Sequence, residues 1–405
     1  MQAGSPSLSL NNLYRPEILA NPYSFYQRLR SEAPIHWDGY LHGWVLTRYA
    51  DVVACLPDRR ISADRTVSLM DRMPPEQRAA LRRLFEVNAR QLAFLDPPDH
   101  TVIRRILNPV FTLEAVAALR ERIQSIVDQL LARSQSGGRL DLVRDLADPL
   151  PALVIAELVG IPFQDLQQLR AWYDESFNLL GASITQAQLD RALKTFDTML
   201  GYFRTMLARL QQRPQPSLLG MLVSGQDVRA FSEDELFAQC QLFLDAGHGP
   251  PASILASSIW LLLQHPDQLR RLRDDPALVG SALEECLRYE SPVQLVIRRA
   301  QEDVPVDGVQ IRQGDLVYLM LGAANHDPAR FAEPERFDIG RDPNPHLAFG
   351  YARHRCIGQW LARLEGEIVL TTLLQRLPTM RLGTDAAVWQ KTLALRGLAA
   401  LPVVI

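Results

Sequence analysis

Two long stretches with helical periodicity lie in the middle of this sequence and constrain its fold most. From Thr112 to Arg133, hydrophobic residues recur every three or four positions, which predicts a helix with Thr112 as its N-cap. A second helix is predicted from Ser232 to Gln264, because Ser232 and Glu235 match the capping-box pattern. A chain with helices this long must bury its hydrophobic residues mainly by packing helix against helix.

Strand signals are short and lie near the two ends of the chain. They occur at residues 44–47, at Val304–Val309 with a turn at Asp307-Gly308, at residues 316–318, and at Leu395–Val404. Many helices combined with short strands predict a mostly-α fold with small peripheral β-sheets. Neither an internal repeat nor a flexible linker is evident, so one domain over residues 1–405 is expected.

Charge and composition exclude several classes of function. The net charge is -3, which gives no general reason to expect nucleic acid or an anionic membrane as a partner. The most apolar stretch, around residues 259–263, is too short to cross a bilayer, and the first thirty residues lack a signal-peptide pattern. We therefore expect a cytoplasmic protein whose four cysteines are reduced.

One of these cysteines lies in a distinctive loop. The segment from Phe349 to Gly358 delivers Cys356 to the start of a predicted helix. The N–H groups and positive dipole end at a helix N-terminus lower a thiol's pKa, and the resulting thiolate can serve as a metal ligand or a nucleophile. For an isolated cysteine, a buried structural thiol at a helix start would be the better interpretation.

The extended pattern around Cys356 resembles the haem-binding signature of cytochromes P450, Phe-x-x-Gly-x-x-x-Cys-x-Gly in its looser form. Phe349, Cys356 and Gly358 are in register, whereas Ala352 replaces the glycine that usually lies four residues before the cysteine. Alanine is tolerated there if its φ angle stays negative. The resemblance implies the cytochrome P450 fold, a heme b cofactor and Cys356 as the axial ligand of its iron, with Phe349 beside the cofactor.

A second resemblance concerns charged residues upstream of the loop. Glu285 and Arg288 are three residues apart on a predicted helix and can pair, which alone would suggest an ordinary surface salt bridge. P450s join such a pair to an arginine from a later Pro-Glu-Arg-Phe segment, here Pro334–Phe337. The resemblance therefore implies a buried structural network of Glu285, Arg288 and Arg336.

Haem carries two propionates, which need cationic or polar partners. His100 and Arg104 are four residues apart on one helical face, and their segment resembles the P450 helix that contacts a propionate. Arg298 and His346 resemble the propionate arginine and histidine of the family. Each residue alone would be interpreted as an ordinary polar or charged side chain, but the four occur in the family's order around the cysteine motif.

The central helix departs from the family pattern. P450s carry an acid and an alcohol after an Ala-Gly pair, and these side chains relay protons during dioxygen activation. Here Ala246 is followed by Gly249 at the acid position and Pro250 at the alcohol position, and neither side chain can donate a proton. Two consecutive prolines are also expected to kink this helix sharply. Four alternatives would account for the missing proton donors. Ordered waters or a group of the substrate would relay the protons, peroxide would replace dioxygen as the oxidant, or the reaction would need no relay.

These features lead to one principal function and two alternatives. The first is monooxygenation of a small or medium apolar metabolite, in secondary metabolism, by a monomeric enzyme supplied by ferredoxin and ferredoxin reductase. The second is peroxide-driven or non-hydroxylating chemistry, such as coupling, desaturation or rearrangement, and the third is a non-catalytic partner protein. Arg353, Arg355 and Arg363 are expected to form a basic surface for an acidic ferredoxin. The apolar residues expected to line the substrate pocket, which would equally suit a core, are Phe94, Phe243, Leu295 and Val296.

Overall fold

The computed structural model describes residues 8–71, 73–134, 138–177, 185–213, 215, 217–224, 231–383 and 387–405. The chain divides into two compact units, each assembled from separate stretches of sequence. Unit 1 comprises Met1–Ser62, Phe111–Leu150 and Gly249–Ile405, and unit 2 comprises Ala63–Val110 and Pro151–His248. The single domain expected over residues 1–405 stays a prediction.

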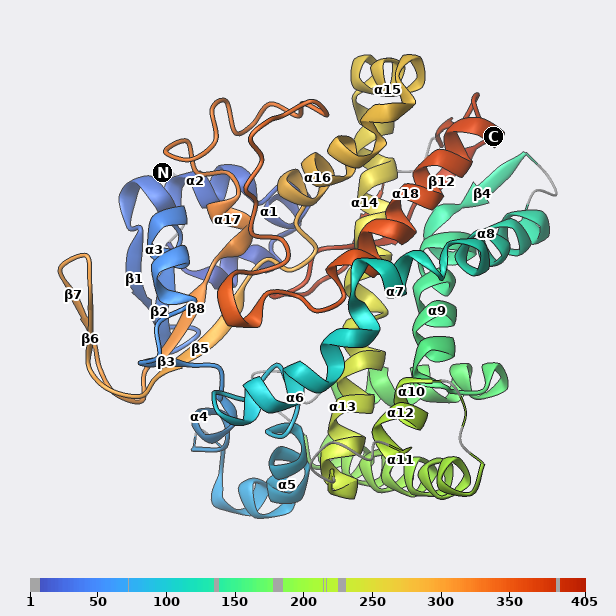
Figure 1. Ribbon diagram of the computed structural model, residues 1–405. Coiled ribbons are helices and arrows are strands. Elements are labelled where there is room, and N and C mark those ends of the chain that lie inside the picture. The colour runs from blue at the N-terminus through green and yellow to red at the C-terminus, as the bar shows by residue number, and fades with distance from the viewer. Residues whose placement is uncertain are drawn as a thin grey trace. The chain divides into compact units, whose positions relative to one another are not determined.

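Helices account for most of both units, and the strands are short (Figure 1). Unit 1 contains α1 (Pro16–Ala20), α2 (Tyr23–Glu32), α3 (Tyr49–Cys55), α7 (Leu113–Ala117), α8 (Arg120–Ser134), α14 (Gly249–Gln264), α15 (Pro266–Asp274), α16 (Val279–Tyr289), α17 (Leu321–Ala324) and α18 (Gln359–Arg376). Unit 2 contains α4 (Thr66–Asp71), α5 (Pro75–Asn88), α6 (Asp99–Leu107), most of α9 (Pro149–Val159), α10 (Leu166–Phe177), α11 (Gln186–Gln212), α12 (Leu218–Ser224) and α13 (Glu233–Ala246). The mostly helical fold with small sheets is therefore confirmed.

The strands that the structure describes all belong to unit 1. They are β1 (Ile35–Asp38), β2 (Gly43–Leu46), β3 (Ile61–Ser62), β4 (Arg139–Asp141), β5 (Val296–Ala300), β6 (Val304–Val306), β7 (Val309–Ile311), β8 (Leu316–Leu319), β9 (Arg381–Leu382), β10 (Val388–Trp389), β11 (Leu398–Ala400) and β12 (Pro402–Val404). The main sheet has the order β1-β2-β8-β5-β3, with only β2 and β8 parallel. Asp307 and Gly308 have positive φ angles of 42° and 79°, which suit the tight β6–β7 hairpin predicted at this pair.

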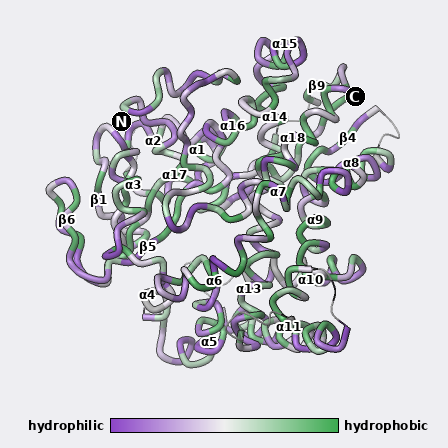
Figure 2. The backbone as a smooth tube through the Cα atoms, in the orientation of Figure 1, coloured by the Kyte–Doolittle hydropathy of each residue, from purple (hydrophilic) through white to green (hydrophobic). Residues whose placement is uncertain are grey.

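The central strand β8 separates two hydrophobic cores. Leu316 and Tyr318 pack into a core with α2 residues, whereas Val317 and Leu319 pack into a core with α3 residues. Successive side chains of a strand point to opposite faces, so a strand covered on both faces is apolar at every position. This explains why residues 316–319 form an uninterrupted apolar run. Helices also differ in hydropathy: Figure 2 shows that α9 is mainly hydrophobic, whereas α15 is mainly hydrophilic.

Both of the long helices predicted from the sequence are interrupted. Thr112 caps α7 as expected, because its side chain accepts the backbone N–H of Ala115, but a turn at residues 118–119 separates α7 from α8. The capping box of Ser232 and Glu235 is present at the start of α13. The caps were therefore predicted correctly, whereas the helix lengths were overestimated.

The segment from Ser232 to Gln264 forms α13 and α14, with a turn at residues 247–248 between them. Pro250 and Pro251 lie in the first turn of α14. Backbone N–H groups in the first turn of a helix have no intrahelical partner, so prolines are tolerated there. The expected helix is therefore interrupted just before the two prolines, which lie where a helix tolerates them, and the sharp kink stays a prediction.

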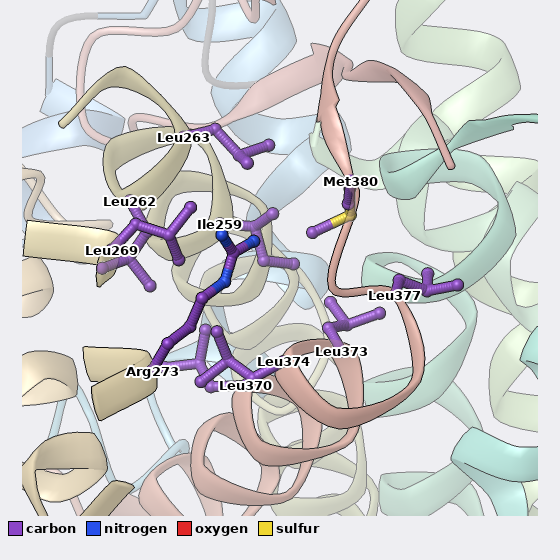
Figure 3. Close-up of a pocket in the computed structure, with 10 residues that line it drawn as sticks. All are labelled: Ile259, Leu262, Leu263, Leu269, Arg273, Leu370, Leu373, Leu374, Leu377 and Met380. Atoms are coloured by element: carbon purple, nitrogen blue, oxygen red, sulfur yellow. The ribbon is translucent and has the colours of Figure 1, made fainter. Parts of the chain in front are cut away.

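A small apolar pocket lies within unit 1 between α14, α15, α18 and the segment after α18 (Figure 3). The pocket contains about 320 Å³ of empty space, part of which is open solvent. Leucine and isoleucine side chains form most of its lining, joined by Met380 and by Arg273. None of its lining residues is a cysteine, histidine or carboxylate, and the thioether of Met380 is the one potential metal ligand in this lining.

Glu365 is an unexpected buried carboxyl group on α18, the helix that also contributes to this pocket. It lies in the second turn of α18 and is 1% exposed, and its Oε2 atom has no hydrogen-bond partner among the described residues. Desolvation raises the pKa of Glu365 from its ordinary 4.5 to about 8. At neutral pH the buried side chain is therefore mainly a neutral carboxylic acid.

We expect Glu365→Gln to increase the free energy of unfolding relative to the wild type as the pH rises from about 5 to about 8. In this range the unfolded chain releases a proton that the folded protein retains, so the carboxyl costs about 1.4 kcal/mol of stability per pH unit. Thermal unfolding of both proteins from pH 5 to pH 8 measures the difference. Parallel stability curves for the two proteins would show that Glu365 titrates normally.

Candidate functional site

The loop before α18 presents one accessible thiol. Cys356 follows a short helical turn, η7 (Ala352–His354), and its backbone N–H donates to the carbonyl of Phe349 at 2.8 Å. Its residue is exposed, whereas the other three cysteines are buried. Burial raises the pKa of Cys55 and of Cys286 to about 12, so these thiols stay protonated. Cys356 alone combines accessibility with a place just before a helix N-terminus.

The backbone of this loop is strained at one alanine. Gly350 and Ala352 have φ angles of 69° and 55°. Glycine adopts such a left-handed conformation freely, but a residue with a Cβ pays about 1–2 kcal/mol. The condition under which alanine would be tolerated at this position, a negative φ angle, is therefore not met. The loop retains the conformation that suits glycine at this position, and the surrounding contacts hold the alanine in it.

A fully buried ion pair lies on α16. Nε and Nη2 of Arg288 each donate to a different carboxylate oxygen of Glu285 at 2.8 Å, and both side chains have no exposed surface. Arg288 also donates to the carbonyls of Asn325, Pro334 and Arg336. The pair therefore holds the irregular segment that precedes the cysteine loop.

The third member of this network is Arg341, not Arg336. Nε of Arg341 donates to both oxygens of Glu285, at 3.1 and 3.2 Å. The side chain of Arg336 is 61% exposed and pairs with Glu333 and Asp338, so only its backbone carbonyl faces the network. Arg341 follows the Pro-Glu-Arg-Phe motif by four residues, which is why the motif alone pointed to the wrong arginine.

The side chain of His346 is engaged by protein groups, contrary to the expected propionate contact. Its Nε2 lies 3.0 Å from an oxygen of Glu284, and its Nδ1 accepts the backbone N–H of Ala348 at 3.2 Å. Arg363 binds the same carboxylate at 2.7 and 2.9 Å. Desolvation opposes ionisation of Glu284, but the hydrogen bonds from His346 and Arg363 prevail and hold its pKa at about 2. Arg363 is 15% exposed, which removes it from the expected basic surface.

Two further residues of unit 1 bear on the propionate prediction, Arg298 in the main sheet and His354 in the cysteine loop. Arg298 projects from β5, is 5% exposed, and donates to the carbonyl of Ile297. His354 lies two residues before Cys356, and its Nε2 atom is buried. The sequence-based search passed over His354 because the cysteine motif leaves that position unspecified.

Unit 2 carries the other two expected propionate ligands. His100 and Arg104 lie one turn apart on α6, and His100 is 3% exposed. Nε of Arg104 donates to the side-chain oxygen of Asn108 at 3.0 Å. Their common helical face agrees with the spacing from which they were selected.

The segment around the α13–α14 turn has no acid or alcohol at positions 249 and 250. Ala246 is exposed, and a Cβ added at Gly249 would meet no atom within 4 Å. At Gly247, by contrast, a Cβ would lie 2.5 Å from a side-chain carbon of Ile155, so this position requires glycine. A Cβ atom therefore fits at position 249 without a clash, so packing does not explain why the acid is missing there.

Asp245 is the carboxyl group that the sequence-based search missed in this segment. It lies in the last turn of α13 and keeps part of its surface accessible. Desolvation raises the pKa of Asp245 well above its ordinary value. It is the one carboxyl group between residues 236 and 264. Its position four residues before Gly249 was a signal available in the sequence.

The four residues expected to line a substrate pocket lie in different surroundings. Phe243 and Leu295 are 4% and 3% exposed, and Leu295 belongs to the core that contains α2. Val296 is half-buried and packs against the other core, and Phe94 is half-buried beneath the guanidinium of Arg65. Core packing therefore accounts for Phe243 and Leu295, and a pocket role for the four residues stays a prediction.

Comparison with known proteins decides the family. The cytochrome P450 family model matches residues 72–380. The chain is 37% identical to the biotin biosynthesis cytochrome P450 of Bacillus subtilis (strain 168), over 96% of this chain and 97% of that protein. It is 36% identical to the vitamin D(3) 25-hydroxylase of Pseudonocardia autotrophica, over 97% and 96%. This chain belongs to the cytochrome P450 family. It is accordingly an oxidoreductase of the P450 monooxygenase type.

A solved P450 shares the fold along nearly the whole chain. The crystal structure of P450BioI, in complex with an acyl carrier protein ligated to hexadec-9Z-enoic acid, superposes with a TM-score of 0.89 at 36% identity. The match covers 96% of this chain and 100% of that one. Among the helices that the structure describes, none combines the length and hydropathy that crossing a membrane requires.

The residues present fit the haem-thiolate cofactor that the P450 family implies. An accessible thiol before a helix supplies the soft anionic ligand that iron needs in a P450. In unit 1, the buried cation Arg298 suits a carboxylate of such a cofactor. The alternative of a buried structural thiol is contradicted for Cys356 by its exposure.

We expect Glu285→Gln and Arg288→Ala each to prevent accumulation of folded, haem-loaded protein. Removing one partner leaves the other buried and uncompensated, at a cost of about 3–5 kcal/mol. Arg336→Ala is the matched control, because that exposed side chain should contribute at most about 1 kcal/mol. The measurement is the haem-to-protein absorbance ratio of purified protein together with its thermal midpoint. Equal losses of haem content and thermal midpoint in all three variants would show that the side chain of Arg336 also belongs to the network.

Proposed function

We propose that this P450 is a haem-thiolate monooxygenase that uses heme b to oxidise a small or medium apolar metabolite of secondary metabolism. The observation that carries the proposal is Cys356, the one exposed cysteine, in the loop that leads into α18. When bound, thiolate-ligated haem supplies oxygen activation, because the thiolate favours O–O cleavage. The fatty acyl group carried in the P450BioI complex and the biosynthetic role of the Bacillus subtilis relative support an apolar biosynthetic substrate.

In this proposal, Sγ of Cys356 would ligate the iron and Phe349 would contact the cofactor. Arg298, His100 and Arg104 bind the propionates. His354 takes the place first given to His346, because both ring nitrogens of His346 already have protein partners. The predicted monomer and cytoplasmic location belong to the same proposal.

Electrons are proposed to come from a ferredoxin and its reductase. Arg355, Tyr351 and Trp360 are exposed around the cysteine loop, with Tyr351 44% and Trp360 37% accessible. Arginine and aromatic residues are enriched at protein interfaces, and a basic rim favours an acidic partner. With Arg363 paired to Glu284, the exposed Arg355 and half-buried Arg353 remain to provide the positive charge.

The empty acid and alcohol positions favour a second candidate, peroxide-driven or non-hydroxylating chemistry such as coupling, desaturation or rearrangement. Gly249 and Pro250 offer no proton donor in the dioxygen pathway. Asp245 is the nearest carboxyl group in sequence, and its raised pKa favours the protonated form that can donate. A non-catalytic partner role is disfavoured because the ligand cysteine is present.

We expect the reduced, CO-bound wild type to show the red-shifted Soret band of thiolate-ligated haem, and Cys356→Ala to lose it. The alanine cannot supply an anionic axial ligand. Cys55→Ala is the control, because a buried thiol should leave the band unchanged. A thiolate band retained in Cys356→Ala would overturn the ligand assignment.

When reduced ferredoxin supplies the electrons, we expect the wild type to divert many of them into peroxide. This should occur on substrates that carry no proton-donating group. The double variant Gly249→Glu/Pro250→Thr should raise product per NAD(P)H consumed, since a positioned acid contributes about 10²–10⁴-fold, whereas Asp245→Asn should lower it. Peroxide assayed in parallel, and turnover with added peroxide alone, separate the two candidates. Tight coupling by the wild type would instead indicate a relay through ordered water.

A further inference from the structure

A second charged cluster in unit 1 links α16 to the two ends of the cysteine loop. Arg363, on α18, forms a two-pronged ion pair with Glu284 on α16, with N–O distances of 2.7 and 2.9 Å. The remaining terminal nitrogen of Arg363 donates to the side-chain oxygen of Gln359 at 3.1 Å. Such fork-like pairs fix orientation as well as distance, because both N–H bonds must align with the carboxylate.

The same guanidinium lies over two aromatic rings. Its central carbon is 4.4 Å from the ring centre of Phe349 and 5.2 Å from that of Trp360. Phe349 is also the residue whose carbonyl accepts the backbone N–H of Cys356. Arg363 therefore contacts the side chain of the residue whose backbone holds the cysteine in place.

His346 closes the cluster from the other side of the loop. It contacts Glu284 through Nε2, accepts the backbone N–H of Ala348 through Nδ1, and its ring centre lies 6.1 Å from that of Phe349. Glu284 thus receives one partner from before the loop and one from the helix after it. Both ends of the loop are anchored to a single carboxylate on α16.

We propose that Arg363 is a positioning residue that, with Glu284, holds Phe349 and thereby the backbone around Cys356. Its effect reaches the thiolate through geometry rather than through its positive charge. This inference rests on the proposed ligation of haem iron by Cys356. Backbone N–H groups near a thiolate ligand tune the reduction potential of the iron, so displacement of the loop should change that potential.

The test compares the midpoint potential of the haem iron in the wild type with that of Arg363→Lys, Arg363→Met and Glu284→Gln. If the loop loosens and the thiolate loses N–H donors, all three variants shift to more negative potential. A purely electrostatic effect predicts a different pattern, in which Arg363→Met lowers the potential, Glu284→Gln raises it, and Arg363→Lys leaves it unchanged. The charge-conserving lysine cannot reproduce the fork or the ring stacking.

Arg376→Met is the matched control, because Arg376 lies at the far end of the same helix from the loop. It pairs with Asp128, at an N–O distance of 2.8 Å. It should match the wild type in potential. Arg363→Lys and Glu284→Gln carry the comparison if Arg363→Met does not accumulate with haem. Shifts of opposite sign, or no shift in these variants, would overturn the proposal. Absence of a thiolate band in the wild type would instead refute the ligand assignment on which it rests.

Discussion

The fully buried ion pair of Glu285 and Arg288 is the interaction on which the arrangement around the cysteine loop depends. Two charges without exposed surface are stable only when every donor and acceptor is used, and here backbone carbonyls and Arg341 complete the set. Those carbonyls belong to the irregular segment after α17, which contains few backbone hydrogen bonds of its own. An irregular chain can therefore keep one conformation directly before the ligand loop.

Adjacent carboxylates on α16 serve two different parts of unit 1. Glu285 binds the irregular segment through Arg341, and Glu284 binds the helix after the cysteine through Arg363. Consecutive helical residues point about 100° apart, so one helix can present one carboxylate to each neighbour. The loop that carries Cys356 is thus flanked by two residues that contact one helix, although it contains a strained alanine at position 352. Strain of this kind persists only where surrounding contacts compensate for it.

The α13–α14 turn separates this chain from the usual P450 pattern. Two prolines begin α14, so the segment contributes neither an alcohol nor an acid at the expected positions, and Gly249 leaves open space there. Asp245, four residues before Gly249 in sequence, is a carboxyl group in surroundings that favour its protonated form. Proton supply is consequently the step in which we expect this enzyme to differ from other members of its family.

Local chemistry explains which features could be predicted from the sequence. Helix caps at Thr112 and Ser232, the Asp307-Gly308 hairpin and the place of Cys356 before α18 depend on residues that are close together in the chain. Contacts between distant residues were decided by the tertiary structure. Arg341 rather than Arg336 reaches Glu285, and His346 and Arg363 share Glu284. Within the described part of the chain, Glu365 is buried without a hydrogen-bond partner for Oε2. A motif specifies spacing along the chain, whereas the partner of a buried charge depends on which side chain the folded backbone brings within hydrogen-bond distance.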